Sequence, residues 1–399
     1  MRGDARAPIL AIAAFLAPPL GLFAPLGLSP LLFVTAAALL AVAAHARRWP
    51  QPPRALLVGC AALALWAALS AAWAIDPGHS LVRALRLVAE LGSGLILLDA
   101  AQTLTPAARN KLFAALVAGL FLGAILVGID RLTDGALVRP LSDRYNGPAA
   151  QDRGSTVCAM LIWPALLWFG RRFGPLPALL LLAATAATVI LLPSDASRLA
   201  LGLGGVIFLL GLSLGRLFAR EGMWAVPLLL LAMPFLPLSL PPPSSLAATE
   251  GIKPSGVHRL IIWRFAAEKV AERPLLGWGF DASRELPGMH DKVALPVGGG
   301  QVAELDIMPL HPHNNAIQIW LELGVVGALI PALLLALLLR RLARPALEPG
   351  ARAMVLATVV ASLVVACLSY GLWQGWWLGA LWFAAAFAAA LFPSETASP

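Results

Sequence analysis

The sequence predicts an all-α protein that crosses a membrane many times. Of its 399 residues, 59% are hydrophobic and only 13% are charged, and the mean hydropathy is +0.81. Ordinary soluble domains contain roughly 45–50% apolar and about 25% charged residues. The apolar residues also form blocks of the length that a helix needs to cross a bilayer. A water-soluble globular fold is therefore excluded.

About 12 transmembrane helices are expected along the chain. The first apolar block runs directly into a second one instead of ending at a small-residue cleavage site, so we expect the N-terminal stretch to remain a span. The expected spans are 9–28, 31–45, 54–74, 81–100, 110–130, 154–170, 176–193, 198–215, 223–240, 315–339, 352–372 and 376–392.

The arginine and lysine residues predict the orientation, because short loops rich in them stay in the cytoplasm. With the N-terminus inside, the cytoplasmic connections contain pairs such as Arg47 and Arg48 or Arg171 and Arg172. The short opposite connections, at 27–30, 76–80 and 371–375, contain no Arg or Lys. An even number of spans then leaves both termini in the cytoplasm.

The chain is accordingly divided into three regions. Residues 1–240 hold the first nine spans, 241–314 form one large outer loop, and 315–399 hold the last three spans and a short cytoplasmic tail. Within the loop, apolar residues at helical spacing predict a short amphipathic helix over 257–270. A Pro-Leu-Leu-Gly-Trp-Gly turn follows at 274–279.

Two arginines lie inside the fourth expected span. Arg83 and Arg86 share one helical face with Glu90, and we expect that face to look into the helix bundle. Ionisable groups within a membrane are costly, so a ligand role is the default interpretation. A structural Arg–Glu pair that locks two helices is the alternative.

Arg198 follows an abrupt Pro-Ser-Asp-Ala-Ser break and is expected at the outer N-terminus of a helix. A cation is unfavourable beside the positive end of the helix dipole, and a bound anion would relieve both positive groups. The planar guanidinium suits a phosphate or diphosphate because it can form two parallel hydrogen bonds. Interfacial snorkelling of a long side chain is the alternative.

The loop helix carries a second arginine pair. Arg259 and Arg264 are five residues apart and cannot share one helical face. Arg259 pairs better with Trp263, whose ring suits the level of the lipid headgroups. We expect Arg264 to face solvent.

The strongest local signal is His311-Pro-His313-Asn314-Asn315, directly before an apolar run. Histidine titrates near neutrality and can accept the proton of an attacking hydroxyl group, and either asparagine could cap the helix. A zinc site is not favoured, because side chains at i and i+2 of an extended segment point apart and no thiolate is near. Histidines that merely occupy a surface loop are the other alternative.

Other cofactor motifs are not found in the sequence. The outer segments contain no closely spaced pair of carboxylates for Mg²⁺ or Mn²⁺, and the Gly-rich stretches contain no Walker motif. Neither a metal nor a nucleotide cofactor is expected.

Three features together resemble the bacterial O-antigen ligase family, which is grouped with O-antigen polymerases and related membrane oligosaccharide transferases. They are Ser197-Arg198 at the start of a span, Arg259 with Ile262-Trp263 before Pro-Leu-Leu-Gly-Trp-Gly, and His-Pro-His-Asn before Glu322-Leu-Gly-Val-Val-Gly. Their order and the single large outer loop extend the resemblance over nearly the whole chain.

The resemblance implies a GT-C-like, metal-independent glycosyltransferase in a Gram-negative inner membrane, with the outer loop and the active site on the periplasmic side. The donor would be a glycan on undecaprenyl diphosphate and the acceptor the lipid A core. His313 would be the base, and Arg198 and Arg259 would hold the diphosphate; inversion at the anomeric carbon would follow from direct displacement. The further candidate substrate-binding residues are His311, Asn314, Arg153, Arg83, Arg86 and Trp263.

Three alternatives remain open. An O-antigen polymerase would use a second lipid-linked repeat as acceptor, but polymerases tend to have two sizeable outer loops, whereas here 241–314 faces the much shorter 131–153. Oligosaccharyltransferases that act on proteins usually add a larger C-terminal region. A transporter of lipid-linked substrates would place its site near the bilayer midplane, often between repeated halves. The expected partners are lipid-linked glycan, acceptor and bilayer, with no nucleic acid and no stable protein partner.

Overall fold

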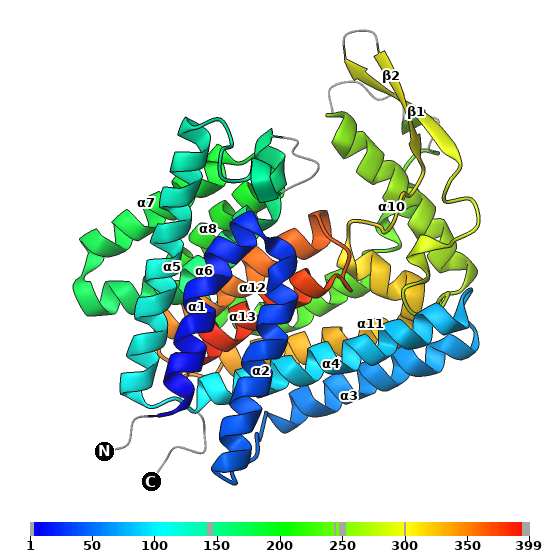
Figure 1. Cartoon of the computed structure of the whole chain (residues 1–399). Helices are drawn as coiled ribbons and strands as arrows, with labels where there is room; N and C mark the ends of the chain where they lie inside the picture. Colours follow the sequence, from blue (N-terminus) through cyan, green and yellow to red (C-terminus); the bar gives the residue numbers. More distant parts are fainter. Residues whose placement is uncertain (1–3, 142–146, 243–244, 247–252, 299–300, 393–399) are drawn as a thin grey trace.

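The computed structural model describes residues 4–141, 147–242, 245–246, 253–298 and 301–392, and these residues form a mainly helical structure (Figure 1). Residues 393–399 of the expected cytoplasmic tail lie outside this part. The α-helices are α1 (Arg6–Phe23), α2 (Leu28–His45), α3 (Arg54–Leu69), α4 (Pro77–Gln102), α5 (Pro106–Leu132), α6 (Asp152–Phe173), α7 (Pro175–Leu191), α8 (Asp195–Ala232), α10 (Pro254–Glu272), α11 (Asn315–Leu342), α12 (Pro349–Leu368) and α13 (Gly375–Ala389).

The helices confirm an all-α, multi-pass membrane architecture. Among the described residues, seven helical segments are long and apolar enough to cross a bilayer, and α7 and α13 are shorter apolar helices. Helices α4 and α6 occupy two further expected spans but contain more polar residues. The count of twelve spans is not confirmed, and the location of the termini stays a prediction.

One pair of expected spans is wrong. Residues 198–215 and 223–240 were expected as two helices, but α8 continues without a break from Asp195 to Ala232 and is followed by a 3-10 turn at Leu236–Ser239. The connecting residues 216–222 are Arg-Leu-Phe-Ala-Arg-Glu-Gly; the first six are compatible with a helix and a single glycine is tolerated, so charge alone does not interrupt the backbone hydrogen bonds. The earlier half of α8 packs on α12 through Gly211, and the later half reaches α11, where Phe235 just beyond α8 contacts Trp320.

Small residues allow the helices to approach closely. Gly119 of α5 faces the backbone of Phe15 in α1, and Gly154 of α6 faces the backbone of Leu22. A Cβ atom at either glycine would meet backbone atoms of the neighbouring helix, so these contacts need glycine. Helix α1 consequently lies directly against α5 and α6 (Figure 1).

The large loop contains the expected helix and an unexpected hairpin. Helix α10 includes the predicted segment 257–270. Strands β1 (Lys292–Gly298) and β2 (Gln301–Asp306) pair antiparallel and project from the same end of the molecule as α10 (Figure 1). Val293 and Leu295 pack on Val257 and Ile261, so the hairpin covers the N-terminal part of α10, whereas Phe265 and Val270 pack against the helix bundle.

The turn at 274–279 docks into a break in α11. Gly324 has φ of 64° inside α11, which frees neighbouring backbone groups. The turn satisfies them: the N–H groups of Trp278 and Gly279 donate to the carbonyls of Leu321 and Glu322 at 2.9 Å, and the N–H of Val325 donates to Pro274. The Leu-Gly-Trp-Gly turn is therefore hydrogen-bonded to the Glu-Leu-Gly segment of α11, and these bonds attach the large loop to the helix bundle.

Candidate active site

The two loop histidines lie together where α11 begins. Asn314 caps the helix, because its Oδ1 accepts hydrogen bonds from the N–H groups of Ala316 and Ile317 at 3.0 and 3.2 Å. The expected N-cap is thus confirmed, and the side chain of Asn314 is fully buried with its Nδ2 atom unpartnered. This cap holds the preceding His-Pro-His segment in a defined position.

The expectation that His311 and His313 point apart is wrong. Their ring centroids are 4.3 Å apart, and the N–H of His313 donates to Nδ1 of His311 at 3.2 Å. The reason is local: His313 has φ of 55°, so the segment turns back on itself and is not extended. The two imidazole rings therefore lie next to each other.

The environment of His313 suits a neutral base. Its Nδ1 atom is hydrogen-bonded to the carbonyl oxygen of Ser369. A carbonyl only accepts, so Nδ1 carries the proton and Nε2 keeps its lone pair. Burial lowers the pKa of His313, the Ser369 bond raises it, and the charges of Arg259 and His258 lower it further. The net shift is downward, so the imidazole stays unprotonated below the ordinary titration range.

Cationic side chains gather around Tyr370, the residue after Ser369. Burial raises the pKa of Tyr370 and the nearby carboxylate of Asp152 acts in the same direction, whereas the hydrogen bond with Thr156 and the charges of Arg153 and Arg259 lower it. Arg259 makes no hydrogen bond or ion pair with any residue in the described ranges, and Arg153 lies over the ring of Trp376 at 5.5 Å. Two guanidinium groups, one from α6 and one from α10, thus lie near Tyr370.

Trp263 supports the histidine segment. Its Nε1 atom donates to the carbonyl of Pro312 at 2.9 Å, between the two histidines. The expectation for Arg264 is wrong: it is largely shielded from solvent, bonds to Glu268 at 2.7 Å and donates to the carbonyls of Leu238 and Leu240. The turn that follows α8 provides these acceptors, which a helical projection of α10 alone does not contain.

Arg198 lies in the first turn of α8, as expected. It donates to Asp195 at 3.1 Å and to the carbonyls of Ile190 and Leu192 at 2.9 Å, and its side chain is 41% exposed. Asp195 also pairs with Lys253 just before α10, at 2.8 Å. This ion pair brings the start of α8 next to the helix that carries Arg259.

Arg83 and Arg86 have different partners. Arg86 pairs with Glu90 at 2.9 Å within α4, which their shared helical face allows; Glu90 is buried, whereas the side chain of Arg86 is 45% exposed and so only partly enclosed by the bundle. Arg83 instead reaches Asp281 at 2.9 Å and donates to the carbonyl of Trp373 at 2.9 Å. It joins α4 to the large loop and to the α12–α13 connection.

Two acidic residues were missed by the sequence analysis. Asp281 pairs with His79, Arg83 and Arg284, and Glu322 is fully buried in α11. The available signal for Glu322 was a carboxylate within an apolar run, which is rare in membrane helices. Asp281 gave no comparable signal, because two of its three partners, His79 and Arg83, come from a distant helix.

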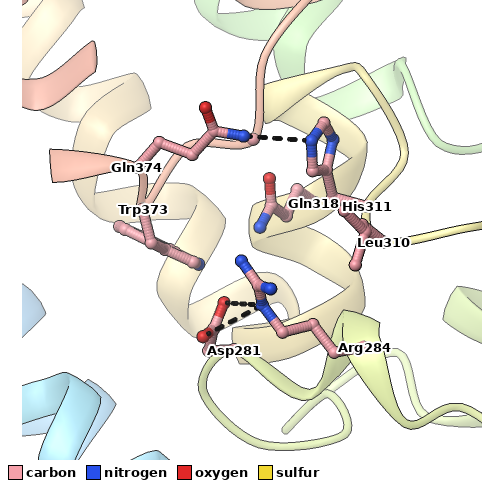
Figure 2. A pocket seen from close by; sticks show the side chains of 8 residues that line it. Asp281, Arg284, Leu310, His311, Gln318, Trp373 and Gln374 are labelled. Atoms are coloured by element: carbon pink, nitrogen blue, oxygen red, sulfur yellow. Dashed lines mark hydrogen bonds and ion pairs between the residues drawn. The ribbon is translucent and has the colours of Figure 1, made fainter. Parts of the chain in front are cut away.

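A small pocket adjoins His311 (Figure 2). Nε2 of Gln374 lies 3.1 Å from Nε2 of His311, and the guanidinium of Arg284 points into the space between Trp373 and Gln318. The lining residues are Asp281, Arg284, Leu310, His311, Gln318, Gly371, Trp373 and Gln374. Polar groups from the large loop, α11 and the α12–α13 connection therefore converge beside the histidine pair.

Fold and site together define a multi-pass helical membrane protein with a histidine–arginine site at the base of its large loop. Residues 178–332 match the O-antigen ligase family. This match confirms, for that segment, the family resemblance predicted from the sequence. The segment includes the three motifs that carried the resemblance. No solved structure matches the chain.

Curated relatives come from Rickettsia. The chain is 30% identical over 264 residues to a Rickettsia bellii protein named "Putative polysaccharide ligase". The matched residues make up 66% of this chain and 62% of the relative. A protein of the same description from Rickettsia prowazekii is 28% identical over 264 residues, again 66% of this chain and 62% of the relative. The chain thus spans less than two thirds of the length of these relatives.

Proposed function

We propose that this protein is an O-antigen ligase, a glycosyltransferase that moves a glycan from undecaprenyl diphosphate to the lipid A core at the periplasmic face of the inner membrane. The observation that carries the proposal is that His313, with a free Nε2 lone pair, lies near Arg259, which has no bonded partner among the described residues. A base beside an unpaired cation suits attack on a sugar whose leaving group is an anion.

The reaction is a single displacement. The acceptor hydroxyl oxygen forms a bond to the anomeric carbon of the donor, and the bond from that carbon to the diphosphate oxygen breaks with its electron pair. The hydroxyl proton moves to Nε2 of His313, as general-base catalysis requires. Attack opposite the leaving group inverts the configuration at the anomeric carbon.

The arginines stabilise the leaving diphosphate. Among the described residues Arg259 has no hydrogen-bond or ion-pair partner and Arg153 lies over the ring of Trp376, so both have donors available. Arg198 would exchange Asp195 for a phosphate oxygen. Fixed positive groups aimed at the developing charge lower the barrier without a metal, because the environment is already oriented.

The deciding experiment is in vitro transfer. Purified protein in detergent is incubated with undecaprenyl-diphosphate glycan and lipid A core in the presence of EDTA, and products are separated on a gel. Transfer to the core lipid supports a metal-independent ligase. Lengthening of the lipid-linked glycan without core modification would instead indicate a polymerase, and no reaction by folded protein would contradict both enzyme functions.

A further inference from the structure

A second cleft lies away from the histidine site, where α1 begins and α2 and α4 end. Its volume is about 910 Å³. One wall is apolar and the rim is basic, and none of the candidate active-site residues contributes to it. The lining includes Leu39, Val42, Ile96, Arg6, Arg47, Arg48, Trp49, Asp99 and Arg341.

Two arginines on the rim have side chains without partners. Arg47 and Arg48 are exposed, and neither guanidinium makes a hydrogen bond or ion pair with any residue that the structure places. Arg6, in contrast, is held by Asp4 at 2.9 Å and by Thr103 at 2.6 Å. The rim therefore offers two adjacent guanidinium groups to an anion.

These two arginines directly follow α2, and the C-terminus of this helix has an unusual backbone conformation. The N–H of Arg48 donates to the carbonyl of Ala43 at 2.9 Å, and the N–H of Arg47 donates to Ala44 at 3.1 Å. This pattern is a Schellman motif, in which the residue at the position of Arg47 adopts a left-handed conformation and is usually glycine. Arg47 has φ of 51°, a left-handed backbone conformation that is unfavourable for arginine and that glycine would adopt more easily.

We propose that this cleft binds an anionic phospholipid, with its phosphate between Arg47 and Arg48 and an acyl chain along Leu39, Val42 and Ile96. Guanidinium groups bind phosphate oxygens through paired hydrogen bonds, and basic residues at a membrane surface attract anionic lipids. The apolar wall belongs to α2 and α4, and α2 carries exposed apolar side chains such as Val34 and Leu40 next to it, which a site for a soluble anion would not require. Trp49, 65% exposed at the rim, suits the headgroup level. The inference is independent of the proposed function.

The test uses the full-length protein in neutral detergent, and thermal unfolding is followed while lipid is added. Phosphatidylglycerol is expected to raise the midpoint in a saturable way, whereas phosphatidylcholine and inorganic phosphate are not. In the Arg47→Gln/Arg48→Gln variant, the half-saturating phosphatidylglycerol concentration is expected to rise roughly 10- to 30-fold. The control, Arg216→Gln/Arg220→Gln, removes two exposed arginines of α8 outside the cleft and should behave like the unaltered protein.

A second variant covers the case in which the double variant fails to fold. Arg47→Gly removes the charge but suits the left-handed position, so it should fold at least as well without lipid and still bind phosphatidylglycerol more weakly. Equal effects of phosphatidylcholine would overturn the proposal, as would unchanged affinity in the Arg47 and Arg48 variants. An equal effect of inorganic phosphate would overturn the lipid assignment and indicate a site for free phosphate.

Discussion

The carboxylate of Glu322 accepts a hydrogen bond of 2.8 Å from the backbone N–H of Asp281, which joins the large loop to the broken helix α11. The side chains of Ser283, Gln318 and Trp373 donate to the same carboxylate, the last two at 2.9 and 2.5 Å. An ionised carboxylate only accepts, so it matches four donors at once. Glu322 therefore holds together the large loop, α11 and the α12–α13 connection.

Replacement of Glu322 by glutamine should destabilise the protein strongly. The amide adds two donors where four donors already converge, and hydrogen bonds to a charged acceptor contribute about 1.5–3 kcal/mol each. We expect the free energy of unfolding to fall by about 3 kcal/mol or more, measured by denaturant titration. Glu268→Gln, which loses only the pair with Arg264, is the matched control; an equal effect of both variants would contradict the central role.

Gly324→Ala should also be destabilising. Gly324 has φ of 64°, and an added Cβ would meet the carbonyl of Leu275 in the docked turn. Backbone at φ 64° and ψ −165° is essentially confined to glycine and costs other residues about 1–3 kcal/mol, and the clash adds to it. A lower unfolding midpoint is expected, whereas Gly202→Ala in α8, where nothing lies within 4 Å, should keep or raise it. A tolerated Gly324→Ala would show that the break in α11 is not required.

Stability should decrease as the pH falls below neutrality. Burial lowers the pKa of His311 to about 3 from the ordinary value of 6.5, and the charges of His313 and Arg284 act in the same direction. Between these values the unfolded chain binds the extra proton, so His311 by itself contributes a loss of about 2 kcal/mol at pH 5 relative to pH 7. Unfolding measured at both pH values should show this loss, and His311→Gln should show less of it. His290→Gln, whose histidine is 70% exposed, should retain the full loss.

His313→Ala should leave the protein folded in the membrane and remove glycan transfer. General-base catalysis typically contributes 10²–10⁴-fold to a rate, so we expect a loss of at least about 100-fold in kcat. His290→Ala, in the turn just before β1, is the control and should retain activity. Full activity of the His313 variant would exclude this residue as the base.

Arg259→Lys should lower kcat/KM for glycan transfer although the charge is kept. A lysine cannot form the paired hydrogen bonds that a diphosphate requires. The loss of one hydrogen bond to a charged group corresponds to a roughly 10- to 100-fold lower kcat/KM. Initial rates at varied donor concentration give this value. Lys253→Arg, at the start of the same helix, should be neutral. Unchanged kinetics in Arg259→Lys would reduce Arg259 to a source of positive charge.

Part of the site was accessible from the sequence because its residues carry local signals. Asn314 directly precedes a helix, Arg198 follows a helix break, and the helix around Arg259 is apparent from its periodicity. The solvent-facing prediction for Arg264 failed, because its partners are carbonyls of a segment more than twenty residues away. The two expected spans that form α8 failed for a related reason: charges between apolar blocks do not show whether the helix continues.

The sequence by itself determined that this chain is a multi-pass helical membrane protein with its polar residues concentrated before α11, because block length and hydropathy are properties of single segments. Only the tertiary structure decided which groups meet. The Ser369 carbonyl that sets the protonation of His313 lies 56 residues further along the chain, and the turn at 274–279 docks on Gly324 from outside the bundle. Such pairings depend on how helices and loops pack around one another, and no periodicity within a segment encodes them.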